Sequence, residues 1–231
     1  MGKKAAARSK PLGLPPDVAA IRKEIRAFYG TPVKDHRKNL GRIKWGVYAF
    51  YDYDGEPIYI GQTFEGFSSR IGRHLTNQRS DAVAMRVLDP FEVAEIRAWP
   101  FDLSKMGDKE VRNYLDRAEF TLFQKVIAES QLKAVLNEKL PKDKDPIQLP
   151  EPIKRRIIPE HLYPERKHPD VRIARRASTI ATLARVISER KVAPGLRRVL
   201  LTQARRLERL ARARLKDFAG VPENEENNEA D

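Results

Sequence analysis

The amino-acid sequence predicts an α+β fold in which helices flank a small sheet and a basic helical hairpin follows. Short apolar and aromatic runs on both sides of Asp54-Gly55 are typical of a β-hairpin, because this dipeptide readily adopts positive φ. Residues 91–99 form a third apolar run that predicts a strand. Apolar residues at helical spacing predict a long helix over residues 108–128 and two more helices within residues 171–217.

Composition favours nucleic acid as the partner. The 231 residues suffice for one domain with an appendage or for two small domains. The 45 Lys and Arg residues outnumber the 32 Asp and Glu residues, and a net charge of +13 points to a polyanion, nucleic acid before membrane. With no cysteine, disulfides, thiolate zinc sites and thiol catalysis are excluded, which fits a reducing compartment.

We expect a cytoplasmic protein, associated with the nucleoid if it is bacterial. The longest uncharged apolar runs have about seven residues, far short of the ~20 that a membrane span requires. The basic N-terminus has no apolar stretch behind it and so does not resemble a secretory signal. Residues 1–16 are predicted to be a disordered basic arm. Residues 17–43 should form a helix, from Asp17 as N-cap to Tyr29 with Gly30 at C′, and a polar lead-in.

The hairpin register follows from its turn. If Asp54 and Gly55 form a two-residue type I′ loop, Tyr53 faces Glu56. The next cross-strand pairs are then Phe50 with Tyr59 and Tyr48 with Gly61.

Two tyrosines of the hairpin are candidates for function. Side chains alternate between the faces of a strand, so Tyr48 and Tyr59 emerge on the same face as diagonal neighbours. The opposite face, expected to pack on a core, carries Val47, Ala49, Ile58 and Ile60. A purely structural role is the alternative, because aromatic residues also favour strands.

A helix with Ser68 as N-cap is expected to run through Leu75. Ile71 and Leu75 point inward, whereas Arg70 and His74 lie one turn apart on a neighbouring stripe. In isolation, a solvated helix face explains Arg70 and His74 equally well.

Glu119 is the carboxylate of interest in the long helix. Leu115, Leu122 and Phe123 surround it at helical spacing, so it lies on or beside the buried stripe. A buried, unpaired carboxylate is unfavourable by several kcal/mol and needs a partner. The sequence supports a salt bridge to an arginine and a metal ion equally.

The C-terminal third changes character twice. Residues 141–170 contain seven prolines and are predicted to be a linker. Residues 171–220 are predicted to form a helical hairpin with a break at Pro194-Gly195. Residues 221–231 should be an acidic disordered tail. The expected apolar stripes of the hairpin are Ile173, Ala177, Ile180, Ala184 and Ile187 in one helix, and Leu196, Val199, Leu200, Leu207, Leu210 and Leu215 in the other.

Within residues 171–217, fourteen basic residues face three acids, which suits contacts to phosphates. The arginines expected to contact DNA are Arg73, Arg175, Arg176, Arg197, Arg198, Arg205, Arg206, Arg209 and Arg212. Base readout, RNA binding and a homodimer formed through the C-terminal helices remain open.

In this order of elements the chain resembles the GIY-YIG nucleases. Gly46-Val47-Tyr48 and Tyr59-Ile60-Gly61 match the two signature elements, and Gln62-Thr63 follows the second as is frequent in that family. Valine replaces the isoleucine of the first element, on the side that faces the core. Arg70, Glu119 and Asn137 match the arginine, the metal-binding glutamate and the asparagine of the family. The resemblance covers roughly residues 44–138, implies a three-stranded antiparallel sheet flanked by helices, and sets the domain at residues 44–140.

The resemblance implies Mg²⁺-dependent (or Mn²⁺-dependent) hydrolysis of double-stranded or branched DNA. Glu119 would bind the metal, Arg70 would neutralise the phosphate, and Tyr48 would take the proton from water. His74 matches a histidine that partners the first tyrosine in the GIY-YIG restriction enzymes and would receive the Tyr48 proton. Tyr59 would orient the water or the phosphate, and Asn137 would tie the end of the Glu119 helix to the site. The alternative is a nucleic-acid-binding protein whose GIY-YIG-like domain is inactive.

Overall fold

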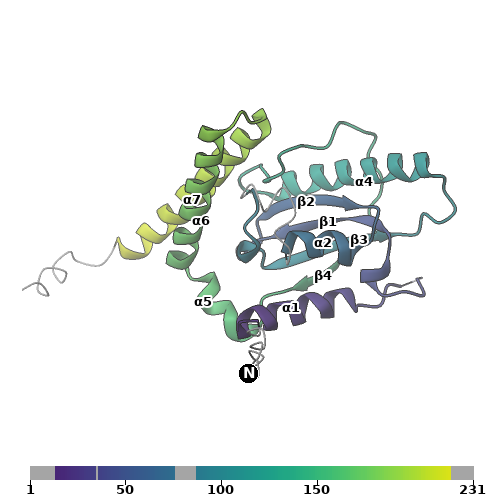
Figure 1. The fold of residues 1–231 in the computed structure, drawn as a ribbon, viewed down its shortest axis with the longest axis horizontal. Coiled ribbons are helices and arrows are strands. Elements are labelled where there is room, and N and C mark those ends of the chain that lie inside the picture. Colours follow the sequence, from purple (N-terminus) through teal and green to yellow (C-terminus); the bar gives the residue numbers. More distant parts are fainter. Residues whose placement is uncertain (1–13, 35, 76–86, 220–231) are drawn as a thin grey trace, which may run out of the picture.

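The protein has an α+β fold built on a four-stranded antiparallel sheet, in the order β2-β1-β3-β4 (Figure 1). The computed structural model describes residues 14–34, 36–75 and 87–219. The strands are β1 Trp45–Tyr51, β2 Pro57–Thr63, β3 Glu95–Phe101 and β4 Ile153–Arg156. The helices are α1 Pro16–Tyr29, α2 Phe67–Leu75, α4 Asp108–Glu129, α5 Tyr163–Lys167, α6 Pro169–Glu189 and α7 Pro194–Phe218. Short 3₁₀ turns occur at η1 Leu40–Arg42, η2 Pro90–Glu92 and η3 Glu160–Leu162.

The fourth strand corrects the predicted number of three. β4 lies inside the segment predicted to be a linker and pairs with residues 95–98 of β3. An edge strand is bonded on one side only and can be short and half-exposed. Three of its four residues are Lys or Arg, and prolines lie close on both sides, so its sequence carries no alternating apolar pattern. Residues 141–170 also contain η3 and α5, so this segment is not a plain linker.

β3 is displaced from the predicted range of 91–99. It begins at Glu95 and continues through Pro100, which pairs with Gly46 of β1. Proline is tolerated there because β4 pairs only as far as Ala98, so β3 has a free side at Pro100.

The β1–β2 register agrees with the prediction, but the turn does not. Phe50 pairs with Tyr59 and Tyr48 pairs with Gly61. The Asp52 amide donates to the Glu56 carbonyl at 3.0 Å, so the loop holds three residues and not two. Gly55 alone in this loop has positive φ, and the register shifts by one residue after Phe50, as in a three-residue loop closed by a bulge.

The two faces of the sheet bury separate cores. The face with Val47, Ala49 and Ile60 packs on a core, as predicted, and α4 covers it. The other face, which carries Tyr48 and Phe50, packs against α1, α2 and the α6–α7 pair. Ile58 was expected with the first group but packs in the second, next to the bulge that interrupts the alternation.

Several helix ends differ from the predicted caps. α1 begins at Pro16, so Asp17 lies in its first turn and Pro15 is the N-cap. Gly30 ends this helix with right-handed φ of −75°. The Ser68 hydroxyl does not cap α2 but donates to the Gly41 carbonyl at 2.8 Å. α4 agrees closely with the predicted range, whereas the predicted tail and most of the basic arm lie outside the described residues.

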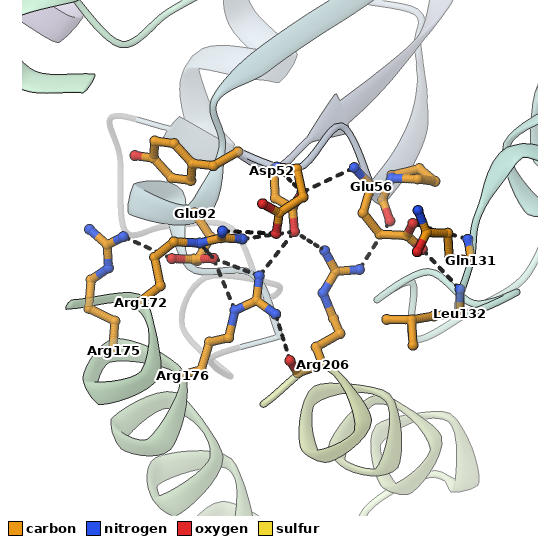
Figure 2. Close-up of polar contacts among 12 residues, drawn as sticks. Asp52, Glu56, Glu92, Gln131, Leu132, Arg172, Arg175, Arg176 and Arg206 are labelled. Atoms are coloured by element: carbon orange, nitrogen blue, oxygen red, sulfur yellow. Dashed lines mark hydrogen bonds and ion pairs between the residues drawn. The ribbon is translucent and has the colours of Figure 1, made fainter. Parts of the chain in front are cut away.

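The α6–α7 pair is bound to the sheet through a buried ion cluster (Figure 2). Arg206, Arg176 and Arg172 place guanidinium nitrogens 2.7, 3.0 and 3.3 Å from the same Oδ2 atom of Asp52. Arg176 and Arg172 also pair with Glu92, at 2.8 and 3.5 Å. We call these five residues the Asp52 cluster. Although burial raises the pKa of Asp52, the three arginines hold it below its usual value.

The Asp52 cluster explains why the predicted apolar stripes are displaced. The buried residues of α6 are Arg172, Arg176, Thr179, Leu183 and Ile187, and those of α7 are Leu196, Val199, Thr202, Gln203 and Arg206. Ala177 and Leu215, assigned to the stripes, are exposed. Because the carboxylates of Asp52 and Glu92 satisfy the arginines, the helices bury a face that contains charges.

Glu56, at the other end of the turn, ties the same hairpin to the end of α4. Its carboxylate accepts from the amides of Gln131 and Leu132, at 3.1 and 3.2 Å, and from the Ser130 hydroxyl. The β1–β2 turn therefore connects the C-terminal helices with the helix that carries Glu119. In the part of the chain that the structure describes, no helix combines the length and the apolar character needed to cross a bilayer.

Candidate active site

A pocket of about 570 Å³ lies at the free edge of β2, where α2 and α4 approach from opposite faces of the sheet. Its lining includes five of the six residues predicted to be catalytic, which are Tyr59, Arg70, His74, Glu119 and Asn137. Gly61, Gln62, Arg73, Glu138 and Lys139 also line it. The strand edge thus brings together side chains from four distant segments of the sequence.

Tyr48, the sixth residue, lies directly behind Gly61. A Cβ atom at position 61 would stand 2.5 Å from the Tyr48 hydroxyl, so only glycine lets this phenol lie across the β2 backbone. The Tyr48 side chain is fully buried, and its hydroxyl has no hydrogen-bond partner among the described residues. Burial, followed by the neighbouring Tyr59, raises the pKa of Tyr48 well above its usual value, and the charge of Arg70 only partly offsets this. Tyr48 is therefore a protonated phenol at neutral pH.

Arg70 and His74 project from α2 toward the two tyrosines, one helical turn apart. Burial by itself lowers the pKa of Arg70, but Tyr48 and Tyr59 raise it above its usual value, so the guanidinium stays charged. The His74 ring lies 5.0 Å from the Tyr59 ring and 6.1 Å from the Tyr48 ring, measured between centroids. Burial, with the charges of Arg70 and Arg73, lowers the pKa of His74 to about 4. His74 is therefore a neutral imidazole, and neither ring nitrogen has a partner among the described residues.

Glu119 reaches the pocket from α4 and is bound by Gln62 of β2. The Gln62 Nε2 atom lies 3.0 Å from Glu119 Oε2 and also 3.0 Å from Asp116 Oδ1. Burial, together with the charge of Asp116, raises the pKa of Glu119 to about 7. In the described part of the chain, no arginine or lysine nitrogen lies within 4.0 Å of the Glu119 carboxylate. Of the two partners left open by the sequence, the salt bridge to arginine is therefore not formed by any arginine that the structure describes.

Asn137 closes the edge of β2. Its side-chain Oδ1 accepts from the Ile60 amide at 3.0 Å, and its Nδ2 donates to the Ile60 carbonyl at 2.8 Å. Asn137 thus replaces a neighbouring strand at this one residue and holds the segment after α4 against the pocket.

Gln62 and Asp116 are two residues of the pocket region that the sequence reasoning did not assign a role. Asp116 precedes Glu119 by three residues, so both carboxylates lie on one side of α4. This spacing alone predicts that Asp116 lies near Glu119. The contact of Gln62 with both carboxylates could not be predicted from the sequence, because it depends on how β2 packs against α4.

The arginines expected to contact DNA fall into a buried group and a partly or fully exposed group in the structure. Arg176 and Arg206 are 5% and 2% exposed and belong to the Asp52 cluster, and Arg175 pairs with Glu92 at 2.9 Å. Arg176 and Arg206 are buried and their charges bind α6 and α7 to the sheet, whereas Arg175 is partly exposed and pairs with Glu92. The contacts of the others are those of Arg73 with Glu65, Arg198 with the Glu138 carbonyl, Arg209 with Gln131, and Arg212 with Glu208.

Arg197 and Arg205 of α7 are exposed and have no acidic partner among the described residues. Arg198 lies at the rim of the pocket, since Asn137 and Glu138, to whose carbonyls it donates, both line the pocket. The start of α7 is therefore next to the candidate active site.

A small antiparallel sheet flanked by helices, with this site at its edge, is the fold expected of the GIY-YIG nucleases. Residues 44–106 match the family model described as the GIY-YIG catalytic domain, so the chain contains a domain of the GIY-YIG superfamily. The matched segment spans β1, β2, α2 and β3 and ends before α4, which carries Glu119. No curated protein and no solved structure matches the chain. The domain points to a nuclease, and hence to nucleic acid as the substrate.

Proposed function

We propose that the protein is a metal-dependent endonuclease that hydrolyses phosphodiester bonds of double-stranded or branched DNA. The observation that carries this proposal is the convergence of Tyr59, Arg70, His74 and Glu119 on one pocket with the Tyr48 hydroxyl behind it. Hydrolysis requires a nucleophilic water, stabilisation of charge on the phosphate, and help for the leaving oxygen. The pocket has a candidate for each requirement.

Glu119 would hold a single Mg²⁺ or Mn²⁺ ion. It fits such an ion because its carboxylate is largely buried, faces a second carboxylate and lacks a cationic partner among the described residues. The described residues contain no group of three or more His, Asp or Glu side chains that could hold a metal ion, so water and phosphate oxygens would complete the shell. When bound, the metal supplies electrostatic stabilisation of the leaving O3′.

Tyr48 would be the general base, although it is protonated at rest. A phenol with a raised pKa accepts a proton from water only after it has lost its own. Neutral His74 can accept that proton, because one nitrogen of a neutral imidazole has a free lone pair and neither ring nitrogen has a partner among the described residues. With a pKa of about 4, the resulting imidazolium is short-lived, and the proton passes on to solvent through the pocket. Arg70 would stabilise the charge that builds up on the phosphate.

DNA would run from the pocket along the exposed arginines at the start of α7. Charge reversal at Arg197 and Arg205 should weaken DNA binding and reduce its salt dependence by about two counterions. Lys23→Glu is a matched control, because Lys23 is exposed on α1, which packs beside β4 at the far edge of the sheet. Equal affinities of the Arg197/Arg205 variant and wild type across salt concentrations would place the DNA elsewhere.

The direct test is digestion of supercoiled plasmid by the purified full-length protein with Mg²⁺, followed by sequencing of the ends. Glu119→Ala and Arg70→Ala should each abolish cleavage while DNA binding persists. Recurrent ends would indicate a restriction or homing type of activity, and scattered nicks another nuclease role. Tight, EDTA-insensitive binding without any nicking of plasmid, branched or single-stranded DNA would refute the proposal in favour of an inactive GIY-YIG domain.

A further inference from the structure

One amide group, that of Gln62 in the pocket lining, joins the carboxylates of Glu119, which also lines the pocket, and Asp116. Gln62 Nε2 carries two hydrogens, and its two acceptors, Asp116 Oδ1 and Glu119 Oε2, are both 3.0 Å away. Asp116 and Glu119 are three residues apart on α4, so they present their carboxylates on the same side of the helix. The amide hydrogens are thus the only positively polarised group among the described residues that bridges this pair.

Two further groups at this pocket lack partners. The Gln62 Oε1 atom is buried and accepts no hydrogen bond from any described residue. His74 is 3% exposed, lines the same pocket, and has both ring nitrogens unpartnered within the described residues. A buried polar atom without a partner is unfavourable and marks a place where a further group is expected.

The site also has an excess of negative charge. Two carboxylates share one neutral amide, and although the charge of Arg70 lowers the pKa of Glu119, no ion pair between Arg70 and Glu119 is found among the described residues. Oxygen atoms of carboxylates are the ligands that Mg²⁺ and Mn²⁺ prefer. A divalent cation would therefore supply the positive charge that the neutral Gln62 amide lacks.

We propose that Asp116 acts together with Glu119 in holding the cation, and that the Gln62 amide occupies their shared position when no cation is bound. This inference rests on the proposed metal-dependent function and adds a second carboxylate and a competing amide to the single glutamate assigned above. Gln62 must release the carboxylates before the cation enters, so it lowers the affinity of the site. Asp116 raises that affinity, either as a direct ligand or through a bound water.

Calorimetric titration of the full-length protein with Mn²⁺, without DNA, tests the proposal. Asp116→Asn should lower the affinity about 10-fold to 100-fold, the range for removing a group that supports a metal ligand. Glu129→Gln removes one charge from an exposed site of the same helix and should leave the affinity unchanged. Gln62→Met keeps the length of the side chain without its amide, and should bind Mn²⁺ at least as tightly as wild type.

Each other result overturns a part of the proposal. Wild-type affinity in Asp116→Asn would remove Asp116 from the site, and weaker binding by Gln62→Met would make the amide a ligand and not a competitor. Circular dichroism and thermal unfolding of each variant without metal separate these results from loss of fold. A wild-type protein that cuts plasmid while Asp116→Asn binds Mn²⁺ normally would refute this inference alone. A protein that binds Mn²⁺ through both carboxylates and cuts no DNA would refute the proposed function alone.

Discussion

Removal of the Asp52 carboxylate is predicted to destabilise the whole protein and not only its C-terminal helices. One oxygen of Asp52 accepts from three guanidinium groups, at 2.7, 3.0 and 3.3 Å, and all four side chains are at most 6% exposed. In Asp52→Ala, Arg172 and Arg176 keep Glu92, whereas the guanidinium of Arg206 keeps only the Pro57 carbonyl, at 3.2 Å, among the described residues. A buried charge left without its partner destabilises a protein by about 3–5 kcal/mol.

Urea unfolding followed by circular dichroism measures this effect. For a protein of this size, 3–5 kcal/mol corresponds to a fall in Tm of roughly 6–20 °C. Glu208→Ala is the control, because it breaks the exposed Arg212–Glu208 pair, which contributes only about 0.3–0.5 kcal/mol. If Asp52→Ala unfolds within about 1 kcal/mol of wild type, the cluster does not bind the helices to the sheet as inferred.

Three further predictions concern the pocket. Because the pKa of His74 is about 4 when folded and 6.5 when unfolded, the stability conferred by neutral His74 is present above pH 6.5 and lost as the pH falls toward 4. Urea unfolding of His74→Phe should therefore show a shallower pH dependence in this window, by up to one proton, and an unchanged slope would contradict the burial of a neutral imidazole. Gly61→Ala places a Cβ 2.5 Å from the Tyr48 hydroxyl, so it should fold but lose cleavage; normal cleavage would separate this contact from activity. Asn137→Ala leaves both backbone groups of Ile60 unpaired and should lower the free energy of unfolding by about 2–4 kcal/mol, whereas exposed Asn113→Ala should change it by less than about 0.5 kcal/mol.

The hairpin shows what local pattern can and cannot predict. Counting from the expected two-residue turn predicts the pairing of Tyr48 with Gly61, and the pairing holds because the one-residue shift after Phe50 offsets the longer loop. The turn itself is one residue longer than the Asp-Gly signal implies. Its geometry is set by Asp52, whose carboxylate accepts from the amides of Asp54 and Glu56 and from arginines of α6 and α7. Partners more than 100 residues away are not visible in a local pattern.

The same limit explains the C-terminal helices. Their lengths follow from apolar spacing, and α6 and α7 lie close to the predicted range. The predicted break at Pro194-Gly195 is displaced, because these two residues begin α7 and the break lies at residues 190–193. Which face they bury does not follow, because hydrophobic periodicity treats every arginine as solvated. Arg172 and Arg176 lie one turn apart on the buried side of α6 because both pair with Asp52 and Glu92.

The sequence predicts which residues belong to the pocket but not how they are arranged. The signature tyrosines, Arg70 and Glu119 were identified from motif and spacing, and the structure brings them to one edge of the sheet. The neutral state of His74 and the bridge from Gln62 to two carboxylates depend on burial and on contacts between β2 and α4. Those contacts exist only once both faces of the sheet are covered.

The most direct test compares wild type with Glu119→Gln on one end-labelled DNA duplex, with binding and cleavage measured in the same Mg²⁺ buffer. Glutamine keeps the size of the side chain and removes its charge. The account predicts that both proteins bind the duplex with similar affinity and that only wild type cuts it. Cleavage by Glu119→Gln at the wild-type rate would contradict a catalytic centre at the edge of β2.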